Sequence, residues 1–202
     1  MLEVKELSCG YGNETIVKDV SFSVNDGEIL AITGPNGCGK TTLLRALCGI
    51  IPYKAGSALI DGKEIRSMSR EELSMNAALL SQTGAGGEYS DFTVRETVAL
   101  GRYAKSKGFG SDKADEAAAE EYMKKTDTLR IADNVITELS GGQLQRVLLA
   151  RAFAQEPKII FLDEPANHLD LKRQIELIEM LKEWSKSGKS VVGVFHDLNL
   201  AA

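Results

Sequence analysis

The clearest candidate for chemistry is a glycine-rich segment that fits the pattern G-x-x-x-x-G-K-[ST]. Its residues are Gly34, Pro35, Asn36, Gly37, Cys38, Gly39, Lys40 and Thr41. Successive backbone N–H groups can surround a phosphate in such a loop, because glycine has no Cβ to clash with it. Lys40 would reach the β- and γ-phosphates of a nucleotide, and the Thr41 hydroxyl would bind Mg²⁺. The alternative is a glycine-rich turn that only caps a helix.

The elements expected around this loop favour phosphate binding. The apolar run at 28–33 predicts a strand that ends at the loop, and residues 41–49 are typical of a helix with leucines on one side. The positive N-terminus of that helix would face the same anion. A position between a strand and a helix is the context in which this pattern binds phosphate.

Two carboxylates follow a second apolar strand. Residues 159–162 are Ile, Ile, Phe and Leu, which is typical of a strand buried in a parallel sheet, and Asp163 and Glu164 come next. Asp163 would hold Mg²⁺, directly or through water, and Glu164 would orient and deprotonate an attacking water. Taken alone, the pair favours an ordinary strand end with solvated acids. Beside a phosphate loop, it favours a catalytic pair.

A third motif, Leu139-Ser140-Gly141-Gly142-Gln143, precedes a helix expected to reach about Gln155. Ser140 and Gln143 have the spacing of a capping box, so a simple helix cap is one interpretation. A cap has no need of two glycines in the first turn, where they weaken a helix. They make sense if a ligand approaches the backbone closely, so the motif predicts a second anion site at a helix N-terminus.

Strands alternate with helices along most of the chain, which predicts an α/β fold with a largely parallel sheet. Further strands are expected at 1–8, 20–24, 57–60, 77–82 and 190–195. Asp26-Gly27 predicts a hairpin turn between the strands at 20–24 and 28–33. Residues 93–154 are almost entirely helical in pattern. One face of a last helix is predicted from Leu171, Ile175, Ile178 and Leu181.

Length and composition are those of an ordinary globular domain: 202 residues, of which 43% are hydrophobic and 26% charged. The net charge of −5 excludes the overall positive charge that is typical of proteins binding nucleic acid. No apolar run approaches the ~18 residues of a membrane span, and no signal-peptide core is expected at the start. The three cysteines lack a metal-binding spacing, which favours a reduced, cytosolic protein.

Taken together, the motifs resemble those of the ATPase subunit of an ABC transporter. The run LSGGQ at 139–143 is the unaltered signature of that family. The other motifs occur in the family's order: the aromatic Tyr11, the glutamine Gln82, the loop at 165–170 and the histidine His196. The resemblance extends from Leu2 to Ala202.

The resemblance implies a P-loop NTPase (RecA-like) core with a mostly parallel sheet, an N-terminal antiparallel β subdomain and an inserted α-helical subdomain. It implies one ABC ATPase domain over 1–202. The nucleotide-binding core would be 1–83 and 156–202, and the helical signature subdomain 84–155. Family members usually continue with further strands and helices, so the C-terminal part of the usual domain is expected to be missing from these residues.

In the family that the chain resembles, two subunits pair head to tail around two ATP molecules. The resemblance therefore also implies roles for the site residues. The catalytic residues would be Glu164 as general base, His196 at the γ-phosphate, Lys40 and Gln82. The ATP-binding residues would be Tyr11 against adenine, Gly34, Pro35, Asn36, Gly37, Cys38, Gly39, Lys40, Thr41 and Thr42. The partner's ATP would be bound by Ser140, Gly141, Gly142, Gln143 and Asp170. Mg²⁺ would be held by Thr41, Gln82 and Asp163.

Longer stretches are similar to ATPases that import iron chelates (siderophores), haem or cobalamin. They are GPNGCGKTTLLRAL at 34–47, TVRETVALGRY at 93–103, EPANHLDL at 164–171 and FHDLNLAA at 195–202. This implies an ATP- and Mg²⁺-dependent motor at the cytoplasmic face of the membrane. Its partners would be a second copy of itself, a polytopic permease and, indirectly, an extracytoplasmic substrate-binding protein. Ala166 departs from the more usual threonine, and Leu144 from a more usual polar residue.

Other functions use some of the same motifs. A soluble ABC ATPase of the iron–sulfur cluster assembly type has no permease, and an ATP-switched interaction module does not hydrolyse. Intact Lys40, Asp163, Glu164 and His196 argue against the second alternative. A phosphate-loop kinase would leave the LSGGQ run unexplained.

Overall fold

Residues 1–81, 91–106, 113–167 and 169–195 are described in the computed structural model of the chain, and they build two four-stranded sheets. The first sheet is antiparallel in the order β2-β1-β4-β5. Its strands are β1 (Leu2–Cys9), β2 (Val17–Val24), β4 (Tyr53–Ile60) and β5 (Lys63–Glu64). The second sheet is parallel in the order β3-β8-β7-β6. Its strands are β3 (Ile29–Ile32), β6 (Ala77–Leu80), β7 (Ile159–Asp163) and β8 (Ser190–Val194).

Strand β7 lies between β6 and β8 and is buried along its whole length. Its side chains alternate between two hydrophobic clusters: Ile159 and Phe161 face one, and Ile160 and Leu162 face the other. This two-sided burial explains why the sequence of β7 is uniformly apolar. The strand ends with Asp163 opposite Val194 of β8, so the first acidic residue lies at the carboxyl edge of the sheet.

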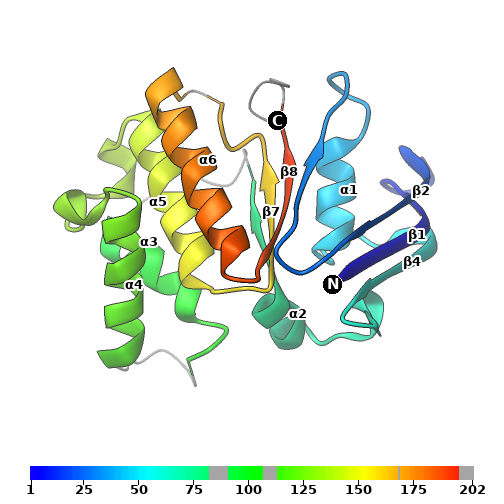
Figure 1. Cartoon of the computed structure of the whole chain (residues 1–202), viewed down its shortest axis with the longest axis horizontal. Coiled ribbons are helices and arrows are strands. Elements are labelled where there is room, and N and C mark those ends of the chain that lie inside the picture. Colours follow the sequence, from blue (N-terminus) through cyan, green and yellow to red (C-terminus); the bar gives the residue numbers. More distant parts are fainter. Residues whose placement is uncertain (82–90, 107–112, 168, 196–202) are drawn as a thin grey trace.

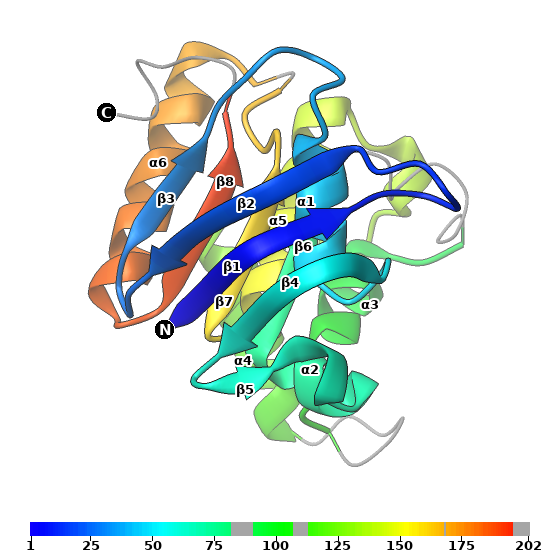
Figure 2. The same cartoon turned by 90° about the vertical axis from the view of Figure 1, so that its right-hand side faces the viewer.

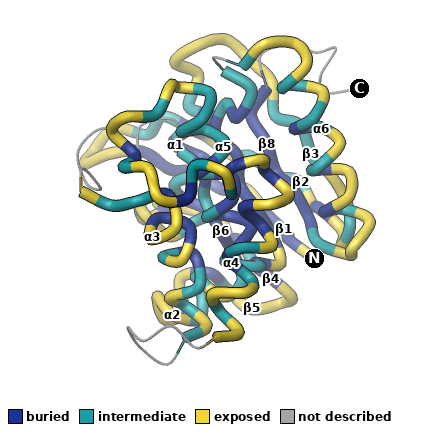
Figure 3. Tube along the Cα trace, turned by 90° about the vertical axis from the view of Figure 1, so that its left-hand side faces the viewer, coloured by how far each residue is buried: buried dark blue, intermediate teal, exposed yellow. Residues whose placement is uncertain are grey.

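Helix α1 (Lys40–Leu47) lies between the two sheets, as the two views agree (Figures 1 and 2). Leu43, Leu44 and Leu47 are buried in the same cluster as Phe161 of β7 and residues of β1 and β4. One helix therefore anchors the antiparallel sheet to the parallel one. Figure 3 shows the central strands largely buried, whereas α2 (Arg70–Asn76) has no buried residue.

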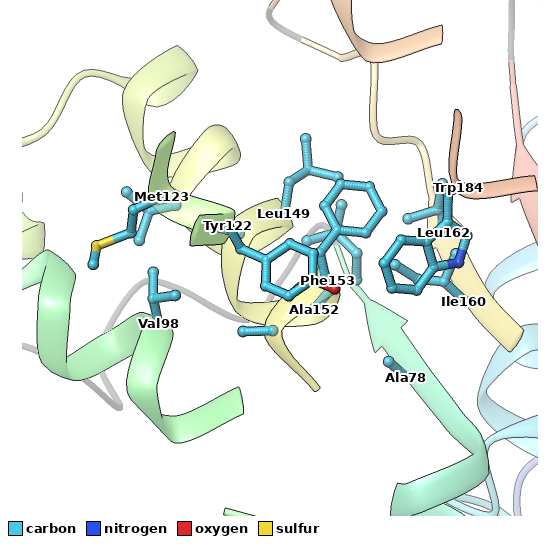
Figure 4. Packing of buried hydrophobic residues seen from close by; sticks show 14 of the residues in the cluster. Ala78, Val98, Tyr122, Met123, Leu149, Ala152, Phe153, Ile160, Leu162 and Trp184 are labelled. Carbon is cyan, nitrogen blue, oxygen red and sulfur yellow. The ribbon is translucent and has the colours of Figure 1, made fainter. Parts of the chain in front are cut away.

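The opposite face of the parallel sheet is covered by helices. Helices α5 (Gly141–Ala154) and α6 (Leu171–Lys186) contact its strands, and α3 (Val94–Ala99) and α4 (Lys113–Lys125) pack on α5. Short 3₁₀ turns lie at Ile65–Ser67, Leu100–Arg102, Leu129–Ile131 and Ile136–Glu138. Tyr122, Phe153 and Trp184 join α4, α5 and α6, and the Phe153 and Trp184 ring centroids are 4.7 Å apart (Figure 4). Among the described residues, no helix combines the length and apolar character needed to cross a bilayer.

The predicted fold class is confirmed: a mostly parallel core sheet, an N-terminal antiparallel sheet and a helical insertion between β6 and β7. The boundaries 1–83, 84–155 and 156–202 stay a prediction. The predicted hairpin at Asp26-Gly27 is wrong. The turn instead leads from β2 to β3 in the other sheet, where Ile29 pairs with Val191. The turn residues allow a reversal, but they do not select the pairing partner: β3 is the edge strand of the parallel sheet, where Leu30 and Ile32 are half-buried against the cluster that contains Phe161.

The predicted face of α6 is confirmed in its second half and wrong in its first. Leu181 is buried and Ile178 packs against the core, but Leu171 and Ile175 are 70% and 49% exposed, and Leu177 and Trp184 are buried instead. The true face is rotated by about one residue position around the helix axis. The aromatic Trp184, which packs on Phe153, determines this rotation because it has the largest apolar surface to bury.

An ionic cluster ties the helical insertion to the start of β7. Arg102, whose side chain is 12% exposed, donates to Asp115 at 2.9 Å and to the Ala154 carbonyl at 2.8 Å. It also lies 2.9 Å from the Glu156 carboxylate, which Lys105 contacts at 2.6 Å. Partial burial alone would raise the pKa of Glu156. Hydrogen bonds from Lys105 and Arg102, with their charges, outweigh this effect and lower the pKa to about 2.

The first prediction concerns Glu156→Gln. Because the pKa of Glu156 is lower in the folded state than its ordinary value of 4.5, its contribution is present above pH 4.5 and is lost as pH falls toward 2. We expect the variant to lower the free energy of unfolding by about 1–3 kcal/mol at pH 7, because Arg102 loses an ionic partner. The difference in the free energy of unfolding between the wild type and the variant should become smaller as the pH falls below 4.5. Urea unfolding across this pH range measures it.

A matched control is Glu121→Gln, which breaks the exposed pair of Glu121 with Lys125 on α4. Exposed pairs of this kind contribute about 0.3–0.5 kcal/mol. Equal destabilisation by the two variants, or a Glu156 effect independent of pH, would contradict the prediction.

Candidate active site

The glycine-rich loop ends at Gly39, which is the N-cap of α1 with a φ of 100°. A Cβ there would lie 2.7 Å from Val17 Cγ2 and 2.9 Å from Ile16 Cγ2, so both backbone conformation and packing require glycine. No side-chain hydrogen bond among the described residues caps this helix. Its first N–H groups therefore suit an external anion.

Lys40 lies under the loop and is 8% exposed. Its Nζ donates to the carbonyls of Gly34 and Pro35, each at 2.8 Å, and lies 4.0 Å from Cys38 Sγ. These contacts hold the ammonium group inside the curve of the loop. A cation and a helix N-terminus thus act on the same small volume, which is the electrostatic requirement of a phosphate site.

Thr41 and Asp163 join the loop to the end of β7. The Thr41 hydroxyl donates to Asp163 Oδ1 at 3.1 Å, and Asp163 is 4% exposed. Burial raises the pKa of Asp163, and the hydrogen bond from Thr41 opposes that shift. Mg²⁺ in nucleotide sites is held by one or two protein oxygens together with phosphates and water. A hydroxyl and a carboxylate oxygen in contact fit that requirement.

Glu164 follows with a φ of 55°, a left-handed conformation that is uncommon for a residue other than glycine. This conformation turns the chain away from the strand direction directly after Asp163. Glu164 lines a cavity of 710 Å³ in front of the glycine-rich loop. The other lining residues are Ile16, Asn36, Gly37, Gly39, Lys40, Thr41, Thr42 and Asn167. The structure thus brings the loop and the acidic residue to one cavity.

The LSGGQ segment begins α5 with a complete capping box. Ser140 Oγ accepts from the Gln143 N–H at 3.3 Å, and Gln143 Oε1 accepts from the Ser140 N–H at 2.9 Å. A Cβ at Gly141 would meet no described atom within 4 Å, and one at Gly142 would meet only Leu169 Cδ2, at 3.8 Å. Packing within the described chain does not require either glycine.

The two candidate anion sites lie apart. In Figure 1, α1 and α5 are on opposite sides of β7 and β8. LSGGQ residues are not among those that line the 710 Å³ cavity. The described chain therefore builds the glycine-rich loop and the signature helix as two separate surfaces.

The remaining predicted site residues take varied positions. Tyr11 is 43% exposed, and its hydroxyl accepts a hydrogen bond from Arg45 Nη1 of α1 at 3.1 Å; it does not line the cavity. Asp170 is the N-cap of α6 and accepts from the Arg173 N–H at 2.9 Å. The predictions for Gln82 and His196 lie outside the described residues.

Sequence reasoning missed Ile16 and Asn167, which line the cavity, and Gln145, which donates to the Pro165 carbonyl at 3.0 Å. Ile16 carries no chemical signal, because it is an ordinary apolar residue before β2. Gln145 carries no signal either, because a half-buried amide on a helix can bond any carbonyl nearby.

The sequence of the chain is similar to those of proteins that bind ATP. A model of the ABC transporter family matches residues 17–167. YvrA of Bacillus subtilis, an uncharacterized ABC transporter ATP-binding protein, is 44% identical over 204 residues, which cover 100% of this chain and 46% of YvrA. The iron(3+)-hydroxamate import ATP-binding protein FhuC of the same organism is 38% identical, covering 100% of this chain and 75% of FhuC.

The dimeric structure of MJ0796, a bacterial ABC transporter cassette, superposes with a TM-score of 0.88 at 31% identity. It covers 100% of this chain and 90% of that one. A second dimeric structure of MJ0796, in a post-hydrolysis state with ADP and Pi, has a TM-score of 0.87.

The chain belongs to the ABC transporter family. It is one of the family's ATP-binding cassettes, so the resemblance drawn from the motifs is confirmed. Its similarity to FhuC confirms the finer resemblance to ATPases that import iron chelates. The chain spans less than half of YvrA and three quarters of FhuC.

Proposed function

We propose that the chain is the ATP-hydrolysing motor of an ABC importer for an iron chelate such as a siderophore, or for haem or cobalamin. The observation that carries the hydrolytic part is the single cavity in which Lys40, Thr41 and Glu164 meet, with Asp163 bonded to Thr41. Lys40 and the α1 amides bind the β- and γ-phosphates. Ile16 offers an apolar contact to the nucleoside, and Tyr11 stacks on adenine.

The reaction is a direct transfer of the γ-phosphoryl group to water. Glu164 accepts a proton from water, and the water oxygen forms a bond to the γ-phosphorus. The bond from that phosphorus to the β–γ bridging oxygen breaks, and the bridging oxygen keeps the electron pair. The products are ADP and inorganic phosphate. Mg²⁺ bound by Thr41 and Asp163, with Gln82, would neutralise charge that develops on the phosphates.

Two copies paired head to tail would complete each site. Gly141 and Gly142 leave the start of α5 open to a ligand that the described chain does not supply. In the pair, Ser140, Gly141, Gly142 and Gln143 of one copy contact the γ-phosphate on the loop of the other, and Asp170 lies at the interface. His196 contacts the γ-phosphate of its own site. ATP then closes the pair through contacts that ADP cannot make.

Transport requires a polytopic permease, against which the cassette lies at the cytoplasmic face of the membrane. A substrate-binding protein outside the membrane would act indirectly, and nucleic acid is not a partner. FhuC, named for iron(3+)-hydroxamate import, supports this function over the iron–sulfur assembly alternative. The intact site supports it over a module that only binds ATP.

The second prediction tests hydrolysis with Glu164→Gln. The amide keeps the size of the side chain but cannot accept the proton from water, so we expect kcat to fall by at least about 100-fold. The affinity for ATP should stay within about threefold, because Glu164 is not part of the phosphate loop. Phosphate release and fluorescent-nucleotide titration measure the two quantities. A wild-type rate in this variant would refute Glu164 as the base.

The third prediction tests the head-to-tail pair with Gly141→Asp in the Glu164→Gln background. A Cβ at Gly141 meets open space, and an acidic residue in the first turn stabilises a helix, so the free energy of unfolding should not fall. The same carboxylate would repel the partner's γ-phosphate. By light scattering with Mg-ATP, we expect Glu164→Gln to dimerise and the double variant to stay monomeric while binding ATP. Equal dimerisation would exclude the pairing.

The fourth prediction concerns the permease. A tagged chain recovered from gently solubilised native membranes should carry a polytopic protein, identified by mass spectrometry. Transport of a labelled iron chelate should stop in cells that produce only Glu164→Gln. Recovery of soluble partners alone, with uptake unchanged, would favour the iron–sulfur assembly type and leave the nucleotide chemistry intact.

A further inference from the structure

The residues after Glu164 form a tight turn. The Glu164 carbonyl accepts a hydrogen bond from the Asn167 N–H at 3.2 Å, and Pro165 occupies the second position. Proline presets the φ angle which that position needs. The Leu169 N–H donates to the Ala166 carbonyl at 3.2 Å. These two hydrogen bonds constrain the backbone on either side of Asn167.

Two amide side chains from neighbouring helices hold the loop in place. Gln145 of α5 donates to the Pro165 carbonyl at 3.0 Å. Gln174 of α6 donates to the Leu169 carbonyl at 3.2 Å and to the Ala166 carbonyl at 3.4 Å. Pro165 itself is buried. The position of Asn167 is therefore set by the packing of α5 and α6 and not by the loop alone.

From that position, the Asn167 side chain returns to the acidic residue. Its Nδ2 donates a hydrogen bond to Glu164 Oε2, and both residues line the cavity in front of the glycine-rich loop. Glu164 needs such support because its φ of 55° does not by itself define where the carboxylate lies. An amide donor fixes one carboxylate oxygen and with it the plane of the group.

We propose that Asn167 is a positioning residue that holds the Glu164 carboxylate in its orientation for accepting the proton from water. This inference rests on the proposed hydrolytic function. Asn167 touches neither nucleotide nor water in this role; it acts through Glu164 alone. Gln145 and Gln174 extend the same support to the backbone on which Asn167 stands.

The fifth prediction is that Asn167→Ala lowers kcat for ATP hydrolysis about tenfold and leaves KM within about twofold, because a donor to a charged group is lost while the phosphate loop is unchanged. Asn167→Asp keeps the shape but places a second carboxylate against Glu164, so its kcat should be lower still. Both are measured by phosphate release at saturating Mg-ATP, with unfolding curves recorded in parallel.

A double-mutant cycle separates positioning from a structural role. In the Glu164→Gln background, Asn167→Ala should change the residual rate by less than about twofold, because its effect passes through Glu164. Asn76→Ala serves as the matched control. It removes an Asn donor to the Glu72 carbonyl on α2, outside the cavity lining, and should leave kcat unchanged.

The outcomes test separately whether Glu164 is the base and whether Asn167 positions it. A wild-type rate in Glu164→Gln overturns the hydrolytic mechanism itself. If Glu164→Gln is strongly impaired as expected, but Asn167→Ala keeps the wild-type kcat or lowers the rate by the same factor in both backgrounds, the mechanism stands and the positioning role of Asn167 is refuted.

Discussion

The burial of β7 on both faces is the constraint on which the rest of the structure depends. Because both faces of the strand are buried, turning it over would put Leu162 into the space that Phe161 fills, and a slip by one residue would draw the Asp163 carboxylate toward an apolar cluster. Asp163 consequently lies at a fixed position at the carboxyl edge of the sheet, where the Thr41 hydroxyl donates a hydrogen bond to it. The same strand positions Glu164 one residue further on. Apolar packing thus determines the geometry of a polar site.

The sequence was sufficient wherever a pattern has a single local cause. Strand β7, the loop before α1 and the capping box at Ser140 each follow from spacing and residue type, and each is found in the structure. It failed where the outcome depends on a distant partner. The turn at Asp26-Gly27 is sterically suited to a hairpin, but the strand that follows it, β3, pairs with β8 instead. On α6, Trp184 overrides the face that Leu171 would suggest.

The candidate site shows the same division. Residues with a chemical signature could be predicted from spacing, because phosphate, metal and proton chemistry restrict the residue types. Asn167, Gln145 and Gln174 carry no such signature, since an amide can serve any carbonyl or carboxylate nearby. Their significance appears only when tertiary structure shows which groups they meet: one carboxylate and three loop carbonyls. Supporting residues of a site are therefore harder to find from sequence than the residues they support.

Helix α5 carries both the LSGGQ segment and one of the residues that hold the loop after Glu164. Its first turn carries Ser140 and the two glycines, open to a ligand from outside the described chain. One turn further, Gln145 holds Pro165, beside Glu164. A helix moves as a rigid rod over so short a length, because its backbone hydrogen bonds resist bending. The Gln145 hydrogen bond therefore couples the N-terminal part of α5 to the loop that follows Glu164. The surface that would recognise the partner's nucleotide and the side chain that holds the loop beside the proposed base lie on one helix.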